Sequence, residues 1–161
     1  MVRIAVLVSG GGTNLQALID AQSRGELKNG RIAAVLSSRP DAYALDRAAR
    51  AGIPGYVVAR KDFASNREMT IALVDKLREL NIGLVVLAGF LHILTGEMVA
   101  AFPNAILNVH PALIPSFCGA GYYGLHVHEA ALAYGVKLTG ATVHFVNEEP
   151  DGGPIVLQRA V

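Results

Sequence analysis

Three short runs of apolar residues, rich in valine, isoleucine and leucine, are the clearest pattern along the chain. They span residues 4–8, 32–36 and 84–88, and each is continuous rather than alternating with polar residues. Strands that are covered on both faces of a sheet have this pattern, because neither face meets water. The three runs therefore predict central strands of a parallel sheet.

Segments with helical spacing of apolar residues lie between these runs. Helices are predicted over residues 14–24, 43–51, 66–80, 96–101 and 127–134. In the segment 66–80, the buried stripe is assigned to Ile71, Val74, Leu77 and Leu80. Alternation of strands and helices along one chain predicts an α/β fold with a doubly wound, mostly parallel sheet.

The second half of the chain adds further strands to this sheet. A short strand is predicted at 55–58, and the run AILNV at 105–109 predicts another. The last two, at 139–146 and 155–161, alternate between apolar and polar residues, which favours antiparallel pairing at the sheet's edge. Residues 1–161 are therefore interpreted as one domain.

Composition narrows the kind of partner. Apolar residues make up 52% of the chain and charged residues 17%, which excludes a disordered protein. The net charge is +1 and no basic cluster is longer than Arg60-Lys61, so nucleic acid and anionic membrane are poor partners and a small molecule is favoured. We expect a monomer or a homodimer. Cys118 is the only cysteine, which excludes an internal disulfide and suits the cytoplasm.

A glycine-rich loop, VSGGGTN, follows the first predicted strand and opens the first helix. Backbone N–H groups from Gly11 to Asn14 would face a helix N-terminus, which attracts phosphate. A dinucleotide motif would need glycine in place of Leu15 and an acid at the end of the second strand, where Ser37 and Ser38 stand. A loop that binds a nucleoside triphosphate would need a Lys-Ser or Lys-Thr pair at the start of the helix, and this pair is also missing. The loop therefore predicts a monophosphate site.

The stretch LNVHP places two polar side chains at the end of a buried strand. Asn108 and His110 are two residues apart, so they point to the same face. A carboxamide and an imidazole at this edge can stabilise a developing oxyanion, and the imidazole can relay a proton. Asp151, in EEPDGGP, is the candidate carboxylate that would orient His110 and favour its charged form. A plain hairpin aspartate is the alternative, and spacing alone does not separate the two.

The remaining histidines give no metal motif. His126 and His128 begin a predicted helix, where residues two apart diverge by about 200°, so a solvated or capping role is favoured for both. His144 alternates with Thr142 on a strand and is expected to be a neutral, hydrogen-bonded histidine. No bound metal is predicted.

Four motifs together resemble the family of phosphoribosylglycinamide formyltransferases: GGGTNLQAL, LAGFLHIL, NVHPALIPSF and TGATVHFVNEEPDGGPIVLQ. The resemblance covers essentially the whole chain. It implies a Rossmann-like formyltransferase domain that transfers the formyl group of 10-formyltetrahydrofolate to the glycine amine of 5-phosphoribosylglycinamide in purine biosynthesis. A hydrolase of formyltetrahydrofolate, a methionyl-tRNA formyltransferase and an inactive phosphate-binding module are the alternatives.

The resemblance also implies roles for individual residues. Gly12, Thr13 and Asn14 would bind the substrate phosphate. Asn108 would hold the formyl oxygen, His110 would act as general acid and electrostatic stabiliser, and Asp151 would support it, with Thr142 and His144 behind them. The folate would contact Arg67, Leu91, His92, Ile93, Leu94, Asn108, Asn147, Glu148, Glu149 and Pro150.

Three departures from the family accompany this resemblance. His92 stands where some relatives carry arginine, which affects any charged contact with the folate. The loop from Cys118 to Gly124 is longer than in the shorter relatives. Members of the family continue for several tens of residues beyond the strand that ends at Val161, so this domain is expected to lack their C-terminal segment.

Overall fold

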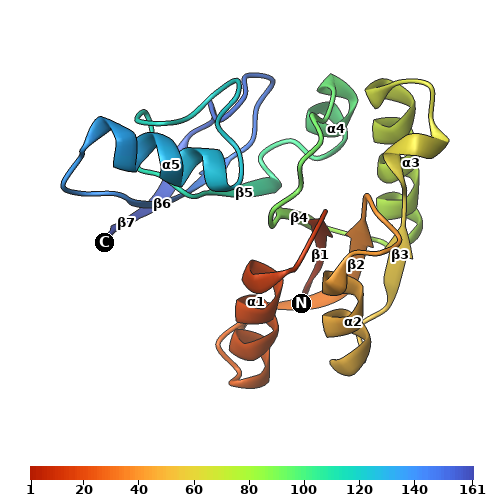
Figure 1. The fold of residues 1–161 in the computed structure, drawn as a ribbon. Coiled ribbons are helices and arrows are strands. Elements are labelled where there is room, and N and C mark those ends of the chain that lie inside the picture. The colour runs from red at the N-terminus through yellow and green to blue at the C-terminus, as the bar shows by residue number, and fades with distance from the viewer.

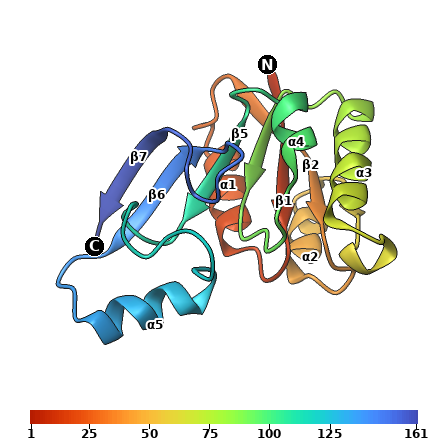
Figure 2. The same ribbon diagram turned by 90° about the horizontal axis from the view of Figure 1, so that it is seen from above.

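The computed structural model describes residues 1–161 and contains one seven-stranded sheet with helices on both faces (Figures 1 and 2). The elements in chain order are β1 (Val2–Val8), α1 (Thr13–Ser23), β2 (Gly30–Ser37), α2 (Tyr43–Arg50), β3 (Gly55–Val57), the 3₁₀ turn η1 (Arg60–Asp62), α3 (Asn66–Glu79), β4 (Leu84–Leu87), α4 (Gly96–Ala101), β5 (Ile106–His110), α5 (Leu125–Tyr134), β6 (Gly140–Phe145) and β7 (Ile155–Ala160).

The strand order is β3-β2-β1-β4-β5-β6-β7. Strands β1 to β5 pair in parallel, and β6 and β7 join them antiparallel. The predicted fold class is therefore confirmed. Because the chain runs from β1 to one edge and then returns to place β4 on the other side of β1, the loops after β1 and β4 lead to opposite faces and leave a crevice between them.

Alternate side chains of β1 belong to two separate cores. Ala5 and Leu7 pack in a cluster with residues of α3 and α4, whereas Val6 and Val8 pack in a cluster with residues of α1 and α2. All four side chains are fully buried. This double coverage is the physical reason for the continuous apolar runs, and Figure 1 shows the two helix pairs on opposite faces of the sheet.

The buried stripe of α3 differs from the predicted one. Ile71 is 37% exposed, whereas Met69, Leu73, Val74 and Leu77 are buried. The assignment of Ile71 to this stripe was wrong, because steps of three residues each turn about 300°, so that two such steps leave Ile71 about 120° away from Leu77. Leu80 is partly buried and packs against the core, as predicted. The stripe that faces the sheet mixes steps of three and four.

None of the helices has the length and apolar character needed to cross a membrane.

We expect Leu77→Ala to lower the free energy of unfolding by about 2–5 kcal/mol, because its fully buried side chain would leave a cavity under the sheet. Ile71→Ala on the same helix is the matched control and should cost less than about 1 kcal/mol. Urea unfolding followed by circular dichroism measures both. Equal losses would contradict the burial described for α3.

Candidate functional site

A cavity of about 690 Å³ lies at the carboxyl ends of β1, β4 and β5. The loop before α1 contributes Gly11, Thr13 and Asn14 to its lining. The end of β5 contributes Asn108 and His110, and the turn before β7 contributes Asp151. The structure thus brings the predicted phosphate loop and the three predicted catalytic side chains to one cavity.

The glycine loop presents free backbone donors to this cavity. The first hydrogen bond of α1 runs from the N–H of Gln16 to the carbonyl of Gly12 at 2.9 Å, so the N–H groups of Thr13 and Asn14 have no partner within the helix. Arg47 donates from Nε to the carbonyl of Gly11 at 2.8 Å and steadies the loop from α2. An anion at this end of α1 would accept hydrogen bonds from the free N–H groups.

Gly12 itself does not line the cavity, and its contribution is steric. Its backbone φ is +74°, a value that residues with a side chain rarely adopt, and a Cβ atom there would lie 2.7 Å from the Cβ of Ala44. Only glycine therefore lets the loop turn into α1 while α2 packs against it.

The pairing of β5 with β6 fixes the orientation of the Asn108 amide. Asn108 lies opposite His144 in the sheet. His144 is 1% exposed and its Nδ1 lies 2.9 Å from the carbonyl of Phe145, which can only accept a hydrogen bond. Its Nδ1 therefore carries the proton, and Nε2 accepts a hydrogen bond from Asn108 Nδ2 at 3.1 Å. The structure thus shows a hydrogen-bonded His144, and its Nε2 also lies 3.8 Å from a carboxylate oxygen of Asp151.

Thr142 supports the segment that follows β5. Its hydroxyl donates to the carbonyl of Ala112 at 2.7 Å and accepts from the N–H of Ile114 at 3.1 Å. Thr142 is fully buried and lies opposite His110 in the sheet. It thus holds the chain as it leaves the strand and does not touch the cavity.

Asp151 points into the site although it lies on a turn. Gly153 makes this possible, because its backbone packs so closely on β6 that a Cβ atom would overlap the carbonyl of Phe145. The side chain of Asp151 is 14% exposed. One carboxylate oxygen lies 3.5 Å from Asn108 Nδ2 and 3.6 Å from His110 Nδ1, and the other accepts the N–H of Gly119 at 2.8 Å. The structure thus answers the question that spacing left open.

The imidazole of His110 is held at both nitrogens. Nε2 lies 2.8 Å from the carbonyl of Phe117, so it carries a proton, and Nδ1 faces Asp151. A charged imidazolium donates from both nitrogens, and this arrangement offers an acceptor to each. His110 is 4% exposed and still lines the cavity.

A second cavity of about 160 Å³ adjoins the first on the other side of Asn108. Asn108 and Asp151 line both cavities. The residues that line only the second include most of those predicted to contact folate: His92, Ile93, Leu94, Asn147, Glu148, Glu149 and Pro150.

Two of the predicted folate residues lie elsewhere. Leu91 lines the first cavity. Arg67 lines neither cavity and forms an ion pair with Glu97 at the start of α4. Hydrogen bonds from Thr95, from the backbone and from Arg67 hold the pKa of Glu97 at about 2, so this carboxylate remains a charged partner for Arg67.

His92 does not supply the permanent charge of the arginine found in some relatives. Burial, followed by the positive charge of Arg60, lowers the pKa of His92 from its ordinary value. Both causes favour the neutral form of this histidine.

The sequence interpretation missed contributions from the loop between β5 and α5. Tyr122 and Tyr123 of this loop line the first cavity, and so does His128 in the first turn of α5, which is exposed in agreement with the solvated or capping role predicted for it. The carbonyl of Phe117 holds His110 and the N–H of Gly119 holds Asp151. Backbone contacts of this kind leave no signal in side-chain types, although the glycines mark a loop that folds back.

Cys118 lies in this loop but does not line the cavity. Its thiol is 3.3 Å from the carbonyl of Pro115. Burial, followed by the charge of Asp151, raises the pKa of Cys118, so the thiol stays protonated near neutral pH and is a poor nucleophile. The structure contains no group of three or more His, Cys, Asp or Glu side chains arranged to hold a metal ion.

Comparison with known proteins places this site in a family. The family model for formyl transferases matches residues 2–161. The phosphoribosylglycinamide formyltransferase of Haemophilus influenzae is 48% identical over 161 residues, which are 100% of this chain and 73% of that protein. The human trifunctional purine biosynthetic protein adenosine-3 is 45% identical over 99% of this chain and 15% of its own length.

Solved structures show the same fold. The crystal structure of glycinamide ribonucleotide transformylase 1 from Symbiobacterium toebii superimposes with a TM-score of 0.93 and 46% identity, covering 100% of this chain and 73% of that chain. The phosphoribosylglycinamide formyltransferase of Bacillus halodurans gives a TM-score of 0.91 and 36% identity, over 99% of this chain and 79% of that chain. The chain therefore belongs to the formyl transferase family.

Proposed function

We propose that this protein transfers the formyl group of 10-formyltetrahydrofolate to the glycine amine of 5-phosphoribosylglycinamide, a step of purine biosynthesis. The observation that carries this proposal is that Asn108 and Asp151 line both cavities. A reaction between two bound substrates needs its polar groups at the point where the two meet. Two relatives that are named phosphoribosylglycinamide formyltransferase are 48% and 41% identical to the chain.

The first cavity suits the phosphorylated substrate. The phosphate of this substrate would accept hydrogen bonds from the free N–H groups of Thr13 and Asn14, and its amine would extend toward Asn108. The second cavity suits the pterin end of the folate, because Ile93 and Leu94 supply apolar contact and the 147–150 turn supplies polar groups. To reach the folate, Arg67 would have to break its ion pair with Glu97, and its role remains a prediction.

The proposed chemistry uses hydrogen bonds that the structure holds ready. As the amine attacks the formyl carbon, negative charge builds on the formyl oxygen. The side-chain N–H of Asn108 that approaches Asp151 can donate to this oxygen instead, because its contact with Asp151, at 3.5 Å, is weak. The hydrogen bond to His144, at 3.1 Å, keeps the amide in place. One such donor contributes about 10²–10³ to the rate of reactions of this type.

His110 and Asp151 would then stabilise the developing charge and transfer protons. The imidazolium of His110 would stabilise the oxyanion and supply a proton, and Asp151 would accept the proton of the attacking amine directly or through water. N10 of the folate leaves with a proton, so atoms and charges balance without a covalent enzyme intermediate or a metal. The single cysteine supports the proposal of a reducing compartment such as the cytoplasm.

We expect His110→Ala to lower kcat for formyl transfer by about 10²–10⁴, because it removes both the proton donor and the positive charge. The affinity for inorganic phosphate should change little, since His110 belongs to β5 and not to the loop that carries the free N–H groups of α1. Absorbance of the deformylated folate, recorded with and without the ribonucleotide, measures the reaction.

Cys118→Ser is the matched control for this loss, and it should retain most of the activity because the thiol does not reach the cavity. Equal loss of transfer and phosphate affinity in His110→Ala would contradict the assigned role. Deformylation that proceeds without the ribonucleotide would instead favour the hydrolase.

We expect Gly12→Ala to raise KM for the ribonucleotide about 10-fold or more, because the added Cβ would push α1 away from Ala44 and misalign the free N–H groups. KM for the folate should stay within about twofold, since the second cavity lies beyond Asn108. Steady-state kinetics with each substrate varied in turn measures both constants.

Gly25→Ala isolates the backbone strain from the steric effect. Gly25 has φ +73°, nearly that of Gly12, but open space around the position of its Cβ. This variant should lose stability and keep both KM values. An unchanged KM for the ribonucleotide in Gly12→Ala would rule out the glycine loop as the phosphate site.

A further inference from the structure

A buried serine, Ser9, holds both ends of the turn that follows β4. Ser9 comes directly after β1. Its N–H donates to the carbonyl of Gly89 at 3.1 Å, and its hydroxyl oxygen accepts a hydrogen bond from the N–H of Leu91 at 3.0 Å. Ser9 itself lines neither the first nor the second cavity. Its polar groups therefore act on this turn and not on a substrate.

A second buried serine, Ser38, fixes the place of the Ser9 hydroxyl. Ser38 follows β2, and its hydroxyl oxygen lies 2.7 Å from that of Ser9, a distance at which one hydroxyl donates to the other. The N–H of Ser38 donates to the carbonyl of Val8 at 3.1 Å, which joins the ends of β1 and β2. The Ser9 oxygen therefore has two defined partners, the Ser38 hydroxyl and the Leu91 N–H.

The segment of residues 90–94 depends on this one anchor. Within the segment, the N–H of Leu91 is the only backbone group that hydrogen bonds to another part of the protein. The next anchor along the chain is the N–H of Thr95, which donates to the hydroxyl of Thr70 at 3.2 Å. Without the Ser9 hydroxyl, the backbone of the segment would have no hydrogen bond before Thr95, although it leaves the sheet at a fixed point.

This segment forms part of the wall of both cavities. Phe90 lines the first and the second cavity, Leu91 lines the first, and His92, Ile93 and Leu94 line the second. The ring of Phe90 meets that of His92 edge to face, with the ring centroids 5.7 Å apart. A shift of the segment would therefore change the second cavity most, because four of its five residues line that cavity.

We propose that Ser9 is a positioning residue for formyl transfer, because its hydroxyl fixes the 90–94 segment at the wall of the second cavity. This inference rests on the proposed function, which places the folate in that cavity. The glycine loop begins at the next residue, Gly10, so the support for the folate side and the phosphate loop are consecutive in the chain. The loop itself is held through its backbone and by Arg47, so loss of the Ser9 hydroxyl loosens the folate side and leaves the phosphate side in place.

The test compares Ser9→Ala with the wild type in the full-length chain. The KM for 10-formyltetrahydrofolate should rise about 10-fold, because the Leu91 N–H loses its acceptor and the ligand itself must order the segment. The KM for the ribonucleotide should stay within about twofold. Ser38→Ala should raise the folate KM by only about two- to threefold, because the Leu91 N–H keeps its acceptor. Steady-state kinetics with each substrate varied in turn measures these constants.

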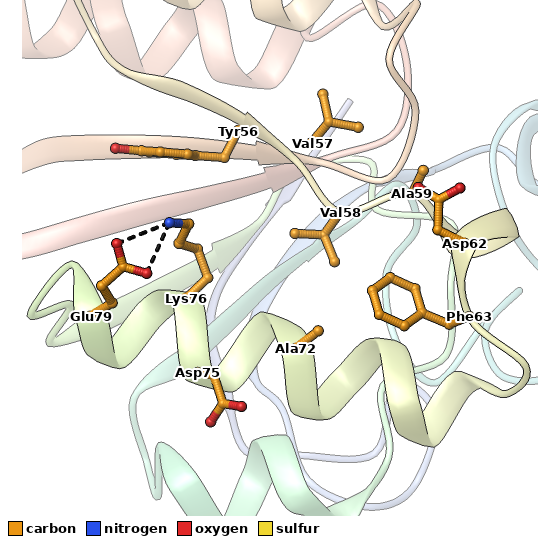
Figure 3. A pocket seen from close by; sticks show the side chains of 10 residues that line it. All are labelled: Tyr56, Val57, Val58, Ala59, Asp62, Phe63, Ala72, Asp75, Lys76 and Glu79. Carbon is orange, nitrogen blue, oxygen red and sulfur yellow. Dashed lines mark hydrogen bonds and ion pairs between the residues drawn. The ribbon is translucent and has the colours of Figure 1, made fainter.

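Ser37→Ala is the matched control, because Ser37 is also a buried serine but its hydroxyl bonds only to the backbone of Arg39. Tyr56→Phe is a second control. It removes a hydroxyl from the cavity of about 470 Å³ between β3 and α3 (Figure 3), whose lining contains no residue of the 90–94 segment. Both variants should keep the KM values of the wild type. An unchanged folate KM in Ser9→Ala, or an equal rise in Ser37→Ala, would overturn the inference.

Hydrogen exchange, followed by NMR on the isotopically labelled protein, separates this inference from the proposed function. In the wild type, the amide of Leu91 should exchange about 10-fold or more slowly than those of Ile93 and Leu94, which have no partner. In Ser9→Ala, all three should exchange at similar rates. A chain that transfers no formyl group but shows this pattern would refute the proposed function and keep the anchor. A chain that transfers the formyl group while Leu91 exchanges as fast as Ile93 would refute the anchor alone.

Discussion

The rest of the site depends on how the carboxylate of Asp151 is held. A side chain that is only 14% exposed has lost most of its water, and a carboxylate in that position is stable only with donors around it. The N–H of Gly119 satisfies one oxygen at 2.8 Å, and Asn108 and His110 approach the other. The charge thereby ties the turn before β7 to the end of β5 and to the loop that follows β5, which are about 30 to 40 residues away in sequence.

This requirement explains the polar residues on the buried strands nearby. His144 would be costly to bury without partners, yet it bonds to the Phe145 carbonyl and to Asn108. No fully buried side-chain nitrogen or oxygen of the structure lacks a hydrogen-bond partner. The long contacts of this network are the approaches of Asp151 to Asn108 at 3.5 Å and to His110 at 3.6 Å, and Asn108 and Asp151 line both cavities. Donors that are already in place, with contacts weak enough to be exchanged for the substrate, are what electrostatic preorganisation requires.

The topology of the sheet decides where this network can form. Because β1 and β4 are neighbours while their following loops go to opposite faces, a crevice opens at their carboxyl ends. β5 lies next to β4 and delivers Asn108 and His110 to the same edge, and the antiparallel strands bring the Asp151 turn back to it.

The sequence by itself determined the elements and the class of fold. Continuous apolar runs require cover on both faces, and alternating ones mark the antiparallel edge, so the strands and their packing could be predicted from local pattern. The position of the glycine loop and the common direction of Asn108 and His110 were also predictable, because spacing along one strand and one helix start fixes where these groups point. The stripe of α3 was predicted wrongly at Ile71, since a spacing of three residues fits several faces of a short helix.

Only the tertiary structure decided what meets across segments. Spacing could not tell whether Asp151 faced water or His110, because that depends on how closely Gly153 packs against β6. It could not assign backbone partners such as the Phe117 carbonyl, since every residue has one. Local pattern records which residues prefer burial, whereas charge balance and close approach arise between distant segments and exist only once the chain has folded.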